Sequence, residues 1–252
     1  NGAPLWLVMS AGRLQSGTTY SGELYRTTGP AFNAVPFTPI TEANLTLMGT
    51  MTVTFSGTDG ATLSYTVNGI PVTKSIVRQV FGSRVANCMP TTASRAALTN
   101  FQDLWWVANG AESGWGVNVT HQDDILFATL FTYDATGRDL WLVMSAGRLQ
   151  ADGSYLGELR RTTGPPFNAA PFTPIGAGNV TTVGTMTVNF SGARAGTLTY
   201  SFNGVSVTKS IQANVYGTRA ANCMATTAAR TSVANYQDLW WNAAESGWGV
   251  NV

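Results

Sequence analysis

Most of the 252-residue sequence occurs twice, and this repetition constrains the fold more than any other feature. The string LWLVMSAGRLQ at residues 5–15 recurs unchanged at residues 140–150, an offset of 135 positions. The shorter strings FTPI, GTMTV, VTKSI and QDLWW recur at the same offset, and AESGWGVNV at residues 111–119 recurs at 244–252 with an offset of 133. Repetition at a fixed period predicts two copies of one structural unit.

Residues 120–135, THQDDILFATLFTYDA, form the one long segment without a second copy. In a continuous array of repeats, this copy would follow Val252 and precede Asn1. The sequence is therefore interpreted as two repeats opened in mid-unit, with one strand-length segment left out at the join.

The composition predicts an all-β protein. The chain is rich in Thr, Ser, Gly and Val, and no long run has helical periodicity. Charged residues make up 11% of the sequence and the net charge is +1, which argues against a nucleic-acid partner. No apolar run approaches the about 20 residues of a membrane-spanning helix, and the opening NGAPLW does not resemble a signal peptide.

The order of predicted strands suggests an antiparallel meander. Residues 5–14 predict a strand in mid-sheet, and Asn68-Gly69 and Asn203-Gly204 lie between alternating apolar residues, as in two-residue type I′ hairpins. The predicted cross-strand pairs are Val67 with Ile70, Tyr65 with Val72, Phe202 with Val205, and Tyr200 with Val207. The Pro-rich segments 29–40 and 164–175 are expected to be ordered loops packed across the end of a sheet.

Eight strands of this kind close into a filled or ligand-holding barrel. We therefore expect two tandem antiparallel up-and-down β-barrel or closed-meander repeats of about 134 residues, the N-terminal one interrupted. The expected segments are an incomplete repeat at 1–88, a connector at 89–102, a complete repeat at 103–222, a connector at 223–236, and tail strands at 237–252. Each connector contains a short predicted helix, PTTASRAALTN or ATTAARTSVAN.

Each repeat has one cysteine, Cys88 or Cys223, placed after the last predicted strand. Three states are open: a bond between the two, a bond to another chain, or free thiols. Lys74 and Lys209 are the only lysines and lie on the inward face of the hairpins. Each either reaches water at the rim or serves as a charged anchor inside a ligand cavity.

The residues that enzymes require are sparse. His121 is the only histidine, and a role in closing a turn is favoured over catalysis. Ser113 and Ser246 lie in Glu-Ser-Gly turns rather than in a nucleophile elbow. Glu112 and Glu245 have no nearby carboxylate partner in sequence, and Asp123, Asp124 and Asp134 do not match a calcium loop. We expect no catalytic residue, no metal and no cofactor.

Tryptophans are the strongest remaining signal. In the adjacent pairs Trp105-Trp106 and Trp240-Trp241, one ring must point to each face of a strand. The outer ring packs against the rest of the chain, stacks on a sugar, or contacts another subunit, and the subunit contact is favoured. The predicted assembly surface comprises Trp240, Trp241, Trp248, Val250, Val252, Leu5, Trp6 and Leu7.

Two resemblances add to these expectations. SGWGVNV, together with Arg84 or Arg219 behind the last strand, resembles the Gly-x-Trp and closing Arg of calycin barrels such as lipocalins and avidins, in which the Arg packs across the Trp. ESGWGVNVTHQ, FATLFTYDATG and LWLVMSAG resemble tandem β-repeat units of uncharacterised secreted bacterial proteins. The second resemblance implies an extracellular or cell-surface location.

Two functions follow. The first is a non-enzymatic structural subunit of an extracellular fibre or surface assembly, in which the tail 237–252 completes an N-terminal half-barrel. The barrel completed is the chain's own or that of the next copy, and head-to-tail polymerisation with the next copy is favoured. The alternative is a secreted barrel that binds a small apolar ligand or a glycan.

Overall fold

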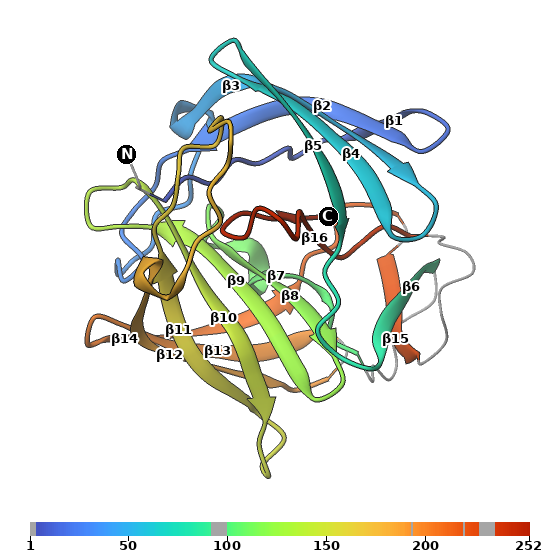
Figure 1. Cartoon of the computed structure of the whole chain (residues 1–252). Coiled ribbons are helices and arrows are strands. Elements are labelled where there is room, and N and C mark those ends of the chain that lie inside the picture. Colours follow the sequence, from blue (N-terminus) through green and yellow to red (C-terminus); the bar gives the residue numbers. More distant parts are fainter. Residues whose placement is uncertain (1–3, 92–99, 193, 219, 227–234) are drawn as a thin grey trace.

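The structure is a computed structural model that describes residues 4–91, 100–192, 194–218, 220–226 and 235–252. Strands in these residues form three antiparallel sheets (Figure 1). The helical elements of the described residues are three short 3₁₀ turns, Glu42–Asn44, Ala108–Gly110 and Ala177–Asn179. The prediction of an all-β protein is confirmed.

The middle of the chain forms a closed eight-stranded barrel, with the strand order β10-β11-β12-β13-β14-β7-β8-β9. Its strands are β7 (Asp103–Val107), β8 (Gly116–Gln122), β9 (Ile125–Tyr133), β10 (Asp139–Leu149), β11 (Tyr155–Thr162), β12 (Val180–Phe190), β13 (Ala195–Phe202) and β14 (Val205–Ala213). Alternate side chains point inward, and Leu130, Leu142 and Leu198 have no exposed surface. The expected antiparallel barrel is confirmed for this part of the chain.

The N-terminal third and the tail form an open seven-stranded sheet, in the order β1-β2-β3-β4-β5-β16-β17. Its strands are β1 (Arg13–Ser16), β2 (Thr19–Thr27), β3 (Leu45–Ser56), β4 (Gly60–Val67), β5 (Ile70–Arg78), β16 (Leu239–Trp241) and β17 (Val250–Asn251). Trp240 pairs with Arg78 and Trp241 with Val77, so the tail adds to the chain's own sheet, beside β5 in Figure 1. Within one chain the tail occupies the position beside β5 of its own sheet, and exchange of the tail between copies stays a prediction.

Both Asn-Gly hairpins form as predicted. Asn68 and Gly69 have φ angles of 50° and 78°, and Asn203 and Gly204 have 50° and 84°. The left-handed conformation at both central positions is the type I′ requirement. All four predicted cross-strand pairs are present.

The prediction of a strand at residues 5–14 is largely wrong. Only Arg13–Ser16 forms a strand, and one isolated bridge joins Val8 to Tyr25. In the barrel, the corresponding residues of β10 form a strand that is hydrogen-bonded to β9. Among the described residues, no strand pairs with residues 5–12 in the way that β9 pairs with β10. The two copies of LWLVMSAGRLQ therefore do not share one secondary structure, although both keep the same register on the following strand, with Arg13 opposite Ser21 and Arg148 opposite Leu156.

The third sheet joins the two predicted connectors. Strands β6 (Val85–Thr91) and β15 (Ala220–Thr226) pair with Cys88 directly opposite Cys223, and a disulfide links the two residues. The first residues of both predicted helices are therefore strand, and the remainder (92–99 and 227–234) lies outside the described residues. The disulfide settles the open question about the two thiols, and the cysteines lie within strands rather than in a tail.

Candidate functional site

The candidate site is formed by the two edge strands of the seven-stranded sheet, whose outer sides have no partner strand among the described residues. Strands β17 and β1 are its edges, whereas in the barrel the corresponding strands β8 and β10 both pair with β9. The flanking sequences are the same in both places, because residues 246–252 repeat 113–119 and residues 5–15 repeat 140–150. We call these two edges, β17 and residues 5–16, together the open edge.

Two apolar side chains beside the open edge are more exposed than their counterparts in the barrel. Val252 is 42% exposed, whereas Val119 is 3% exposed. Leu5 is 36% exposed, whereas Leu140 is 2% exposed. The open edge therefore combines apolar side chains with unpaired backbone groups, the combination that favours addition of another strand.

In the barrel, β9 covers the same side chains. Leu126, Ala128 and Leu130 point inward from β9 and have no exposed surface. Ala128 lies opposite Val119 on one side, and Leu130 lies opposite Leu142 on the other. A strand of this pattern supplies both the apolar cover and the two hydrogen-bonded ladders that the open edge lacks.

Each Pro-rich loop closes the end of the other sheet. The Ile40 N–H donates to the Ser113 carbonyl at 2.9 Å, and the Ile175 N–H donates to the Ser246 carbonyl at 2.9 Å. The loops are packed across sheet ends, as expected, but each crosses the end of the sheet built from the other half of the sequence. Phe32 enters the barrel core, where its ring lies 5.1 Å from that of Phe202.

The two lysines form ion pairs beneath these loops. Lys209 Nζ lies 2.7 Å from Glu112 Oε2, and Lys74 Nζ lies 2.7 Å from Glu245 Oε2, with all four side chains largely covered. Neither lysine is therefore a solvated rim residue, and the charge of each is matched by a glutamate. Burial and then the charge of Glu245 raise the pKa of the neighbouring Tyr65 to about 12.

His121 is buried and bridges several segments. The Phe101 N–H donates to its Nδ1 at 3.1 Å, Tyr155 Oη lies 3.2 Å from its Nε2, and the Asn100 amide donates to its carbonyl at 2.9 Å. Burial lowers the pKa of His121 to about 4, so the imidazole is neutral near pH 7. His121 therefore joins β8 to the segment that precedes β7, and a hydrogen bond with the Asp123 backbone also ties it to the adjacent turn.

The tryptophans occupy several environments. Trp105 and Trp240 have no exposed surface, and their neighbours Trp106 and Trp241 are half-buried, so the rings of each pair separate as predicted. The Trp6 indole N–H donates to the Thr132 carbonyl at 3.2 Å, and its ring lies 5.6 Å from Phe131 of β9.

The other predicted assembly residues divide between the open edge and the loop contact. Leu5, Leu7, Val250 and Val252 lie beside the open edge, exposed or half-buried. The Trp248 indole donates to Glu245 at 3.2 Å and lies at the end that the loop 164–175 closes.

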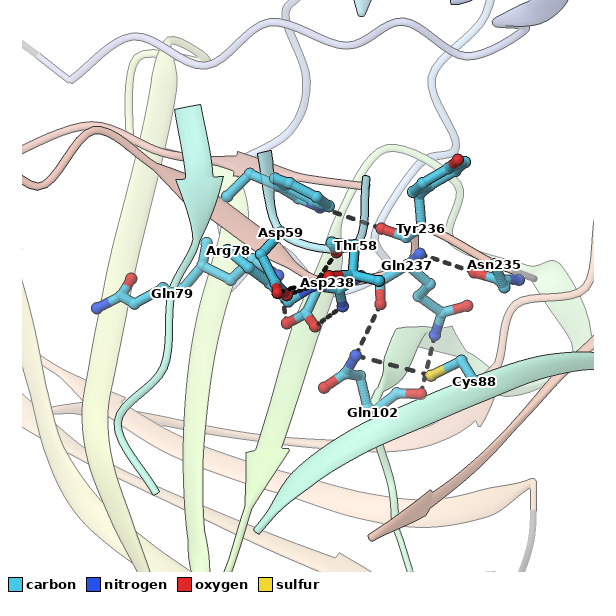
Figure 2. Close-up of polar contacts among 12 residues, drawn as sticks. Thr58, Asp59, Arg78, Gln79, Cys88, Gln102, Asn235, Tyr236, Gln237 and Asp238 are labelled. Carbon is cyan, nitrogen blue, oxygen red and sulfur yellow. Dashed lines mark hydrogen bonds and ion pairs between the residues drawn. The ribbon is translucent and has the colours of Figure 1, made fainter. Parts of the chain in front are cut away.

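A buried arginine fixes the tail to the sheet, as Figure 2 shows. Arg78 pairs with Asp238, and its Nε donates to the Thr58 carbonyl at 3.1 Å. The guanidinium also lies 4.9 Å from the centre of the Trp240 ring. Sequence reasoning missed this residue; the available signal was that Ala213 stands at the corresponding position of the other repeat.

The Gln side chains preceding the two Asp-Leu-Trp-Trp strings exchange hydrogen bonds. Gln102 Nε2 donates to the Gln237 carbonyl at 2.8 Å, and Gln237 Nε2 donates to the Gln102 carbonyl at 2.9 Å (Figure 2). These bonds connect the segment before β7 to the segment before β16, close to the disulfide.

The remaining candidates have structural contacts. Arg84 Nε donates to Asp123 Oδ1 at 3.0 Å, and Arg219 lies outside the described residues.

Within the described residues, no group of three or more His, Cys, Asp or Glu side chains is placed to hold a metal ion. The same part of the chain contains no helix long and apolar enough to span a membrane.

Comparison of the chain with protein-family models, curated protein sequences and solved structures found no match.

Proposed function

We propose that the chain is a non-enzymatic assembly module that accepts an extended strand at the open edge. In this proposal, the seven described strands of this sheet correspond to seven of the eight strands of a second barrel of the same kind. The observation that carries the proposal is the exposure of Val252 and Leu5 beside two unpaired strand edges, while Val119 and Leu140 are buried against β9 in the barrel.

The partner is a strand with the residue pattern of β9, carried by another chain that contains the same repeat. Both sides of the open edge have the same sequence as the strands that flank β9. Side chains on alternate positions fix the register of a strand against such a surface. Because the two flanking sequences match those on either side of β9, they favour a strand with the alternation of β9, in which Leu126, Ala128 and Leu130 face inward.

Donation of β9 by another copy would be a domain swap, in which residues 120–135 leave their own barrel; repeated head-to-tail, such a swap builds an open-ended assembly unless the geometry closes a ring. The disulfide between Cys88 and Cys223 supports an oxidising location outside the cell. We therefore propose a fibre or surface layer as the biological form.

A carrier of a small apolar ligand or a glycan is less favoured. Inward-facing Met144, Leu159 and Met186 of the barrel have no exposed surface, and Phe32 of the loop also packs into this core. A packed interior of this kind offers little volume to a ligand.

A synthetic peptide of residues 120–135 tests strand acceptance. We expect labelled peptide to bind the full chain with a 1:1 stoichiometry, measured by fluorescence anisotropy and native mass spectrometry. A peptide with Leu130→Asp should not bind, because position 130 faces inward, whereas the control Phe127→Asp changes an outward position and should retain binding. Absence of binding by the unaltered peptide would refute strand acceptance.

A fusion tests the link to assembly. Residues 120–135 are appended directly after Val252, where they can fill the open edge of the same chain. We expect the fusion to be a monomer by light scattering and the original chain to form larger species as its concentration rises. A monomeric original chain at every concentration would contradict the assembly role while leaving the peptide result to judge strand acceptance.

A further inference from the structure

A shallow hollow of about 470 Å³ lies on the outer face of the seven-stranded sheet, where β1, β2 and β3 run side by side. Its volume is within the roughly 300–1,000 Å³ of small-molecule sites. The lining consists of amide, hydroxyl and carboxylate side chains and one glycine: Gln15, Thr19, Ser21, Gly22, Glu23, Thr50 and Thr52. The hollow therefore offers hydrogen-bonding groups together with the methyl groups of its threonines.

Hydrogen bonds between neighbouring strands hold the hydroxyl groups of the hollow in place. Ser21 Oγ donates to the Met51 carbonyl at 3.1 Å and lies 2.9 Å from Thr52 Oγ1. One pair further along the ladder, Thr19 Oγ1 lies 3.0 Å from Thr54 Oγ1. A hydroxyl group both donates and accepts, and a short side chain that is already ordered costs little entropy when a ligand binds.

The carboxylate of Glu23 lies at one end of the hollow, opposite Thr50. The Tyr25 hydroxyl donates to Glu23 Oε2 and orients this carboxylate. Arg13 lies opposite Ser21 on β1 but is not part of the lining. A carboxylate accepts hydrogen bonds from the hydroxyl groups of a neutral ligand and repels an anion such as phosphate or sulfate. The charge of the lining therefore favours a neutral ligand.

The corresponding surface of the barrel differs at the centre of the hollow. Leu156 stands at the position of Ser21, and Arg160 stands at the position of Tyr25. Arg160 forms an ion pair of 2.7 Å with Glu158, the counterpart of Glu23. The other polar residues of the lining have polar counterparts in the barrel. One chain thus contains the hollow and a closely matched surface whose central serine is replaced by leucine.

We propose that this hollow binds a neutral saccharide. The hydroxyl groups of a sugar ring donate and accept, as the hydroxyl, amide and carboxylate groups of the lining do, and the C–H bonds of the ring can contact the threonine methyl groups. The site lies outside the packed interior of the sheet and needs no added strand. It therefore goes beyond the proposed function and stands independently of strand acceptance.

The test is a titration of the ¹⁵N-labelled full chain with three neutral tetrasaccharides, cellotetraose, maltotetraose and chitotetraose, followed by ¹H–¹⁵N NMR. We expect at least one of them to bind saturably with a Kd of about 1 mM or below, an affinity suited to a shallow site that leaves part of the ligand in water. The amide signals of residues 15–23 and 50–52 should shift, and those of residues 150–158 and 185–187 should not.

Ser21→Leu gives the hollow the residue found in the barrel and should raise the Kd at least about tenfold, because the leucine side chain fills the site. Leu156→Ser is the matched control and should leave the Kd unchanged. Both substitutions lie on outer faces, and thermal unfolding of each variant checks that the fold is intact.

Glu23→Gln is a second, nearly isosteric variant, which should raise the Kd severalfold by removing a charge-assisted hydrogen bond. The absence of saturable binding by all three tetrasaccharides would overturn the proposal. Binding that neither Ser21→Leu nor Glu23→Gln weakens would overturn it as well, because the saccharide would then occupy another surface.

Discussion

Acidification from pH 7 to pH 5 should destabilise the protein through His121. Burial lowers the pKa of this imidazole from 6.5 to about 4. Between these two values the unfolded chain holds the proton and the folded chain does not. Stability is therefore complete above pH 6.5 and falls as the pH falls toward 4.

The magnitude follows from the two pKa values. At pH 5 the unfolded imidazole is almost fully protonated, and the folded one is about one-tenth protonated. The resulting loss in the free energy of unfolding between pH 7 and pH 5 is about 2 kcal/mol. His121 is the only histidine in the sequence, so no other imidazole contributes to this window.

The assay is urea unfolding at half-unit pH steps from 7 to 5, for the unaltered chain and for His121→Gln. Glutamine keeps a side-chain oxygen that can accept from the Phe101 N–H but does not titrate. Asp139, whose pKa burial raises, is common to both proteins, so the difference in slope isolates His121. Equal pH slopes in the two proteins would refute the assignment.

Three further perturbations test the fold. Gly204→Val should lower the free energy of unfolding by roughly 1 kcal/mol or more, because the turn needs a positive φ there; an unchanged urea midpoint would count against the type I′ turn. Replacing Cys88 and Cys223 together by serine should cost about 2–4 kcal/mol by the same assay, and a loss near zero would mean that β6 and β15 hold without the bond. Arg78→Met should cost about 3–5 kcal/mol by leaving the buried Asp238 without this cation, and adding Asp238→Asn should recover part of the loss; full stability in the single variant would contradict the role given to this pair.

Features set by local pattern could be predicted from the sequence. The hairpins follow from Asn-Gly between alternating apolar residues, and the barrel follows from successive short strands closing on themselves. The repeat pattern of the sequence also pointed to residues 120–135. These residues form β9, the strand that has no counterpart in the seven-stranded sheet among the described residues.

Contacts between distant segments could not be predicted. Lys209 and Glu112 are 97 positions apart, and nothing in either neighbourhood indicates that the loop 29–40 will cover both. The strand at residues 5–14 was predicted from its own alternation, but a strand also needs a partner on its edge. Whether residues at the open edge form a strand therefore depends on the strand beside them. The alternation of apolar residues does not show which strand that is.

The pairing of β6 with β15 has a consequence for the origin of the chain. Cys88 meets Cys223 and Gln102 meets Gln237, each residue touching its own copy at a separation of 135 positions. In an isologous homodimer of identical one-unit chains, the cysteine would meet its own copy once, on the two-fold axis, and the glutamine hydrogen bond would occur twice, once on each side. At the disulfide and the glutamine pair, the two copies of the repeated sequence thus meet as the two subunits of a symmetric dimer do, although both belong to one polypeptide.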